Sequence, residues 1–115
     1  MVRDDRVYLE HMLANAERII RRVQGILRDQ FDGDEDLQIV LTHLVQVIGE
    51  AARNVSEPMR ASIPGVPWKQ IVGMRHRLVH DYMNVDLDVL WEVVTKDISP
   101  LANALSSFLQ SAPKN

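Results

Sequence analysis

Cysteine is absent from the sequence, and this absence excludes four kinds of chemistry at once. Without a thiol the chain has no disulfide scaffold, no cysteine-ligated zinc, no thiol catalysis and no iron–sulfur cluster. Glycine and proline number 5 each among 115 residues, too few for a turn-rich β-sandwich or a low-complexity linker protein. The lack of cysteine also fits a reducing cytoplasm.

Long apolar runs and an excess of positive charge are missing as well. No stretch is long and apolar enough to cross a membrane, and no signal-peptide core follows the charged N-terminus, so we expect a cytoplasmic protein. The formal net charge is -3, whereas proteins that bind nucleic acid through bulk charge are strongly basic. Any surface that binds a polyanion must therefore be local.

The remaining composition is that of one folded domain. Hydrophobic residues make up 46% of the chain and charged residues 25%, which is ordinary for a globular protein and excludes wholesale disorder. A chain of this length buries one hydrophobic core and has no room for two. We therefore expect a single domain over residues 1–115, with a frayed tail at 110–115.

Helical periodicity dominates the chain. Apolar residues recur at steps of three and four, which is the pattern of amphipathic helices with one buried stripe. The expected helices span residues 8–28, 37–55, 68–79, 87–98 and 101–109. No strand pattern competes with them. These segments predict an all-α fold, an antiparallel bundle of four or five helices.

Capping and breaking residues set the expected helix ends. Asp4 or Asp5 can cap the first helix, and Asp34 can cap the second. Asp86 is the expected N-cap of the fourth helix. Pro100 is expected to separate the last two helices.

The densest group of chemically active side chains lies at residues 73–82, where a bundle helix should be largely apolar. The group holds two guanidiniums, two imidazoles, a carboxylate and a phenol: Arg75, His76, Arg77, His80, Asp81 and Tyr82. One interpretation is a catalytic or binding cluster. The other is a solvated helix end, whose cations complement the C-terminal helix dipole.

A metal site is the less favoured chemistry for this group. His76 and His80 lie four residues apart, a spacing at which two histidines share a helix face and bind metal. However, no glutamate stands next to His76 as in the zinc-protease motif, and Asp81 is the only obvious third ligand. His11 and His43 stand alone on helical segments and are interpreted as surface or core-edge residues. We therefore expect no metal and no cofactor.

The order of these polar residues forms a motif. Arg75, His80 and Tyr82 make the pattern R-x4-H-x-Y, which resembles the signature of the HepT family, the HEPN-fold ribonuclease toxins of prokaryotic toxin–antitoxin pairs. Further blocks at residues 48–52, 63–68, 71–75 and 85–91 look like family blocks in the family order. The likeness therefore covers roughly residues 9–109, nearly the whole chain.

The resemblance implies a fold, an activity and a partner. The fold would be HEPN-like and form a homodimer, with the motif of each subunit lining a shared cleft. The activity would be metal-independent cleavage of RNA. The implied partner is a small nucleotidyltransferase antitoxin, which neutralises the toxin by adding AMP to the motif tyrosine, here Tyr82.

Elementary chemistry agrees with these implied roles. RNA carries its own nucleophile, the 2′-OH, so cleavage needs a base for that proton, an acid for the leaving 5′-oxygen and positive charge near the phosphoryl oxygens. His80 is the plausible acid or base of the motif, because imidazole titrates near neutral pH. Arg75 suits the phosphate, because its guanidinium is always charged and donates in a planar fork.

The spacing of the two residues adds a constraint. At ~100° per residue, Arg75 and His80 would lie roughly 140° apart on an ideal helix and would not share a face. Either the helix loosens near residues 79–80, or the site is assembled from two chains. In a two-fold dimer with this helix at the interface, one subunit would supply the base and the other the acid.

Four further residues are candidates for supporting or RNA-binding roles. His76 either binds RNA or orients the site, or it lies on the helix surface, while Arg77 contributes charge. Asp81 either sets the tautomer of a histidine or caps the helix end. Glu50 either holds Arg75 in a buried ion pair, at a cost in desolvation, or lies in water at the edge of the apolar stripe.

Three functions remain in competition on the sequence alone. The first is an RNA endonuclease toxin, which the complete set of Arg75, His80 and Tyr82 favours. The second is a non-catalytic helical dimer that binds a nucleotidyltransferase, which the negative net charge slightly favours. The third is a metal-dependent hydrolase, whose activity EDTA would stop.

Overall fold

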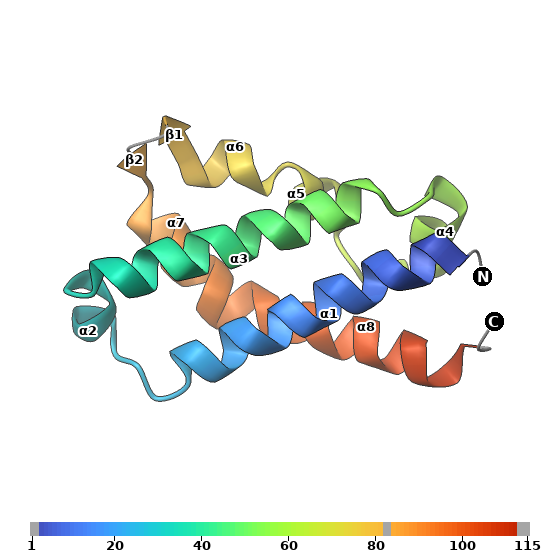
Figure 1. The fold of residues 1–115 in the computed structure, drawn as a ribbon, viewed down its shortest axis with the longest axis horizontal. Helices are drawn as coiled ribbons and strands as arrows, with labels where there is room; N and C mark the ends of the chain where they lie inside the picture. Colours follow the sequence, from blue (N-terminus) through green and yellow to red (C-terminus); the bar gives the residue numbers. More distant parts are fainter. Residues whose placement is uncertain (1–2, 82–83, 113–115) are drawn as a thin grey trace.

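The structure, a computed structural model, describes residues 3–81 and 84–112 and is helical over most of them (Figure 1). Along the chain its elements are α1 (Arg3–Val23), α2 (Arg28–Asp32), α3 (Glu35–Arg53), α4 (Glu57–Ser62), α5 (Trp68–Val72), α6 (Met74–Leu78), β1 (Val79–Asp81), β2 (Asn84–Val85), α7 (Leu87–Glu92), the π-helix η1 (Val93–Asp97) and α8 (Ile98–Ser111). The predicted all-α bundle is confirmed. No helix in these ranges is both long and apolar enough to traverse a bilayer.

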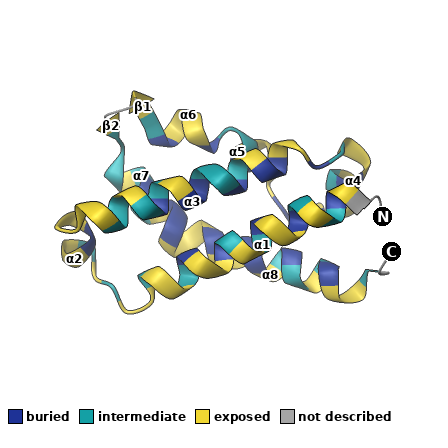
Figure 2. Ribbon diagram, in the orientation of Figure 1, coloured by how far each residue is buried: buried dark blue, intermediate teal, exposed yellow. Residues whose placement is uncertain are grey.

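The core lies where α1 packs between α3 and α8. The buried stripe of each long helix follows the spacing of three and four read from the sequence, and Figure 2 shows buried and exposed residues alternating along these helices. The fully buried side chains of this core include Leu9, Met12 and Ile19 of α1, Leu41, Leu44 and Ile48 of α3, and Ile98 and Leu105 of α8. Shorter elements, from α5 to the hairpin, lie along the other side of α3 (Figure 1).

In the first half of the chain, the end of the first helix differs from the prediction and the start of the second agrees with it. The first helix was expected to reach residue 28, but α1 ends at Val23. Gly25 follows in the left-handed region, with φ 77, where glycine has no steric cost. The second helix begins as expected, because Asp34 accepts a hydrogen bond from the backbone N–H of Leu37.

The second half departs further from the prediction, because the expected third helix is interrupted and ends in a strand. The expected helix at 68–79 is divided at Gly73 into α5 and α6. No strand was predicted, yet Val79–Asp81 pairs antiparallel with Asn84–Val85, with a bulge between Val79 and Asp81. These two short strands form the hairpin that follows α6 (Figure 1).

Pro100 does not separate two helices as predicted. It lies in the first turn of α8, where its missing N–H breaks no α-helical bond. The wider π-helical turn at Val93–Asp97 comes directly before it and connects α7 to α8. The expected helices at 87–98 and 101–109 therefore form one nearly continuous rod, and α8 extends to Ser111, into the segment expected to be frayed.

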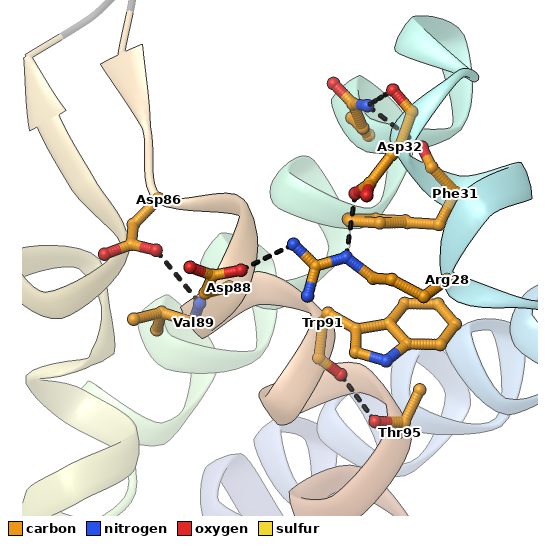
Figure 3. Close-up of polar contacts among 9 residues, drawn as sticks. Arg28, Phe31, Asp32, Asp86, Asp88, Val89, Trp91 and Thr95 are labelled. Atoms are coloured by element: carbon orange, nitrogen blue, oxygen red, sulfur yellow. Dashed lines mark hydrogen bonds and ion pairs between the residues drawn. The ribbon is translucent and has the colours of Figure 1, made fainter.

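A cluster of charged and aromatic side chains joins α2 to α7 (Figure 3). The guanidinium of Arg28 donates hydrogen bonds to Asp32 and to Asp88, and these bonds raise the pKa of Arg28 above its usual value. The same guanidinium lies 5.9 Å from the centre of the Phe31 ring, and Phe31 packs against Trp91 with ring centres 5.0 Å apart. These contacts hold the start of α7 in place, immediately after the hairpin.

Candidate active site

The one-turn helix α6 presents the basic half of the motif to solvent. Met74 and Leu78 lie four residues apart and are both buried, so they fix this short helix on the core. Arg75, His76 and Arg77, between them, are all exposed. The sequence thus places three adjacent basic side chains on a rigid support.

Arg75 lines a surface cavity of about 300 Å³ between α6 and α3, here called the Arg75 cavity. The charged and titratable side chains that line it with Arg75 are Arg53, Glu50 and His43. All four are exposed, and none makes a side-chain hydrogen bond or ion pair among the described residues. Two guanidiniums beside one carboxylate give the cavity a local positive charge, and both are available to an anion.

Glu50 does not hold Arg75 in a buried ion pair, so that hypothesis is wrong. The glutamate is exposed and forms no salt bridge with Arg75, although both residues line the same cavity. The alternative, that Glu50 lies in water at the edge of the apolar stripe, is confirmed. The physical reason is its place on the outer side of α3, away from Leu44 and Ile48, which face the core.

The imidazole of His80 lies beside a carboxylate that is not part of the motif. Nε2 of His80 is 3.7 Å from Oδ2 of Asp86, with side chains that are 58% and 32% exposed. The other carboxylate oxygen, Oδ1, accepts the backbone N–H of Val89 at 3.1 Å and caps α7 as predicted (Figure 3). The backbone N–H of Asp86 donates to the carbonyl of Leu78 at 2.8 Å and closes the base of the hairpin. Hydrogen bonds at two atoms, Oδ1 and the backbone nitrogen, therefore fix Asp86 next to His80.

The end of α6 tests the expectation that the helix loosens between Arg75 and His80. The helix ends at Leu78 and the chain continues as a strand, so the helix does loosen at the predicted place. Within one chain, Arg75 faces the cavity against α3 while His80 faces Asp86. No hydrogen bond or ion pair between Arg75 and His80 is present in the described part of the chain. Assembly of the site from two chains stays a prediction.

The remaining predicted residues are spread over different surfaces. His76 lies on α6 and His80 on β1, so the helical spacing suited to a metal is lost. Within residues 3–81 and 84–112, no group of three or more metal-ligating side chains converges. Arg77 lines a separate cavity with Lys96 and Asp97.

Two further expectations concern Asp81 and Tyr82. Asp81 is exposed on β1, and the carboxylate that faces His80 is that of Asp86 instead. Tyr82, the predicted AMP acceptor, lies outside the described residues.

Three residues of the site were missed by the sequence reasoning: His43, Arg53 and Asp86. His43 and Arg53 share the outer face of α3 with Gln46 and Glu50, at steps of three and four. This polar periodicity was a signal that could have grouped them. Asp86 was identified only as a helix cap, because nothing in the sequence brings residue 86 next to residue 80 unless a hairpin is assumed.

The chain is similar in sequence to a known protein family. A sequence model of the family described as "Ribonuclease HepT-like" matches residues 12–108. The chain belongs to the HepT-like ribonuclease family. The predicted family and its HEPN-type helical fold are therefore confirmed. The matched range contains the residues that line the Arg75 cavity, and also α6 and the hairpin.

Several curated proteins are similar to this HepT-like chain over most of its length. "Putative RNase TTE0752" of Caldanaerobacter subterraneus subsp. tengcongensis is 38% identical over 105 residues, which are 91% of this chain and 94% of that protein. "Probable ribonuclease HepT" of Thermococcus cleftensis is 33% identical, over 88% of this chain and 92% of that protein.

A longer relative contains this region as one part. "Gamma-glutamylcyclotransferase and putative RNase MJ0434" of Methanocaldococcus jannaschii is 33% identical over 100% of this chain but only 52% of its own length. No solved structure shows significant similarity to the chain.

Proposed function

We propose that this HepT-like chain is a metal-independent RNA endonuclease and the toxin of a cytoplasmic toxin–antitoxin pair. The observation that carries the proposal is the exposed guanidinium of Arg75, held with Arg53 in an open cavity, on the short helix that leads directly to His80. Membership of a ribonuclease family supports RNA as the substrate. The roles of the individual residues rest on their chemistry and placement.

In this proposal, Arg75 binds the scissile phosphate and His80 moves the proton. The guanidinium of Arg75 donates in a fork to two phosphoryl oxygens and stabilises the charge that develops on them. His80 either accepts the proton of the 2′-OH or donates one to the leaving 5′-oxygen. The 2′-oxygen attacks phosphorus, the bond to the 5′-oxygen breaks, and the products carry a cyclic phosphate and a free 5′-hydroxyl.

A homodimer completes the proposed site. Arg75 and His80 face different neighbours within one chain, and general acid–base cleavage needs two proton-transfer groups. Two-fold symmetry around α6 and the hairpin would bring two copies of each residue together. One His80 would then act as the base and the other as the acid. His76 and Arg77, both exposed on α6, would extend the basic surface along the RNA.

AMP transfer to Tyr82 is the proposed means of neutralisation. AMP on the tyrosine would place a phosphate and a base beside the cleft, where they would block RNA by charge and volume. We expect mass spectrometry to find AMP on the wild-type chain, and none on Tyr82→Phe, after incubation with ATP and the neighbouring nucleotidyltransferase. AMP on Tyr8 instead, the other tyrosine of the chain, would contradict the assignment.

Asp86 is a predicted positioning residue for His80. Asp86→Asn retains an N-cap oxygen for α7 but removes the charge next to the imidazole. We expect kcat to fall about tenfold, with KM and the thermal midpoint unchanged, because the carboxylate orients the imidazole and stabilises the charge that the ring gains with a proton. The matched control is Asp34→Asn, which also replaces a helix cap but lies away from His80. Equal kcat for both variants would show that Asp86 is only a cap.

The proposed activity is tested by incubating purified protein with RNA in EDTA. We expect cleavage, whereas a metal-dependent hydrolase would be inactive. Absence of cleavage both in EDTA and with added divalent cations would instead support the non-catalytic binding partner, a function that the net charge of -3 favours.

A further inference from the structure

A second cavity, a groove between α3 and the hairpin, lies beside the Arg75 cavity. Its volume is about 630 Å³, within the range of pockets that hold a drug-sized ligand. One wall is the N-terminal half of α3, and the other is the hairpin with the start of α7. The lining residues are Glu35, Gln38, Ile39, Thr42, His43, Gln46, Val79, Asn84, Val85 and Leu87.

This groove continues into the cavity that holds Arg75. His43 and Gln46 line both, so the two hollows meet on the outer side of α3. The distribution of charge differs sharply between them. The Arg75 cavity carries two guanidiniums, whereas the groove has no arginine or lysine and a single carboxylate, Glu35, among its lining residues. A phosphate therefore fits the first hollow and not the second.

The walls of the groove combine apolar side chains with polar side chains that make no hydrogen bond to other described residues. Ile39 is 60% exposed, and the hairpin adds two valines to the apolar surface. The carboxamides of Gln46 and Asn84 and the imidazole of His43 make no side-chain hydrogen bond among residues 3–81 and 84–112. An exposed carboxamide offers a donor and an acceptor side by side, the pairing that reads the edge of a base.

Gln38 and Thr42 are already oriented within this wall. The amide nitrogen of Gln38 donates to the carbonyls of Phe31 and Asp32, at 2.9 and 3.1 Å. The hydroxyl of Thr42 donates to the carbonyl of Gln38 at 2.7 Å. Their remaining oxygens can only accept, so the wall presents fixed acceptors beside the two adjustable carboxamides.

We propose that this groove binds a nucleobase of the RNA, next to the phosphate held by Arg75, and that Gln46 and Asn84 read its edge. The inference rests on the proposed function for the identity of the ligand. Single-stranded RNA exposes unstacked bases whose faces contact apolar side chains and whose edges accept and donate hydrogen bonds. The groove would thus set the base preference at one position beside the cut.

An abasic scan of short, uncleavable 2′-fluoro RNAs tests the proposal without relying on catalysis. For the wild-type chain, removal of one base should weaken binding about tenfold at one position, as expected for the loss of one to two good hydrogen bonds. For the double variant Gln46→Ala/Asn84→Ala, the intact and abasic RNAs should bind within about twofold of each other.

The matched control is the double variant Gln70→Ala/Asn103→Ala, which removes one glutamine and one asparagine that are exposed on α5 and α8, outside the groove. It should retain the tenfold dependence on the base. The same dependence in Gln46→Ala/Asn84→Ala would overturn the proposal. Light scattering on the same double variant tests whether a second copy of the chain occupies the groove. A changed oligomeric state with an unaltered base dependence would show this and would also overturn the proposal.

Failure of the proposed function gives a different result. In that case wild-type protein would not cleave unmodified RNA, while the scan would still report whether a base enters the groove. If the wild-type chain bound none of the RNAs, both the activity and the subsite would be excluded.

Discussion

His80→Ala is expected to slow RNA cleavage in EDTA at least about 100-fold, because a positioned general acid or base contributes 10² to 10⁴ in rate. The imidazole is more than half exposed, and among the described residues its ion-pair partner is Asp86, so its removal should leave folding intact. Initial rates on a fluorescent oligonucleotide measure the effect. The loss should lie in kcat, because a proton-transfer group acts in the transition state.

Arg75→Ala should produce a loss of similar size through a different step. A single donor to a developing oxyanion is worth about 10² to 10³ in rate, and Arg53 in the same cavity cannot replace its position. Arg75→Lys retains the charge but loses the planar fork, so it should recover only part of the activity. A combined variant, His80→Ala/Arg75→Ala, should be scarcely slower than either one, because groups that act as a unit are not additive.

The controls for this experiment come from α1. His11 and Arg18 are exposed on α1, which lies on the opposite side of α3 from the hairpin. The variants His11→Ala and Arg18→Ala should therefore cleave RNA at the wild-type rate. Circular dichroism of all variants checks that the fold is retained. If folded His80→Ala cleaves as fast as His11→Ala, the motif is not catalytic and the ribonuclease assignment to this site fails.

The parts of the fold that the sequence predicts are those built from local patterns. The stripes of α1 and α3 repeat over many turns, so their periodicity identifies both helices without knowledge of their partners. Asp34 and Asp86 act as caps because the bond is made within three residues of each. For these stripes and these two caps the decisive interaction is local, and the expectation is confirmed.

The errors occur where strand pairing overrides the helical preference of the sequence. Val79, which continues an apolar helical pattern, belongs to a strand instead, because it pairs with Val85. Asp86 reaches His80 only through that hairpin. The motif residues could therefore be found from their order, whereas the carboxylate beside the histidine and the groove against α3 needed the structure.

Asp5→Ala is expected to lower the free energy of unfolding by about 3 kcal/mol, the largest stability effect that we predict. Asp4 or Asp5 was expected to cap the first helix, but α1 begins at Arg3 and the Asp5 carboxylate has another partner. Its Oδ1 accepts the backbone N–H of Ser56 at 2.8 Å, and Oδ2 accepts the hydroxyl of Ser56 at 2.7 Å. The side chain of Asp5 is only 4% exposed, and hydrogen bonds to charged groups contribute about 1.5–3 kcal/mol each.

The same contact supports the start of α4. The hydroxyl oxygen of Ser56 accepts the backbone N–H of Met59 at 3.3 Å, so Asp5 fixes the orientation of the residue that caps the helix. Urea denaturation should therefore show a much larger loss for Asp5→Ala than for Asp4→Ala, since Asp4 is exposed in the same turn and should contribute under about 0.5 kcal/mol. Ser56→Ala added to Asp5→Ala should cost little more, because the two residues stabilise the fold through one shared interaction. Equal losses for the Asp4 and Asp5 variants would mean that the buried carboxylate does not join the N-terminus to α4.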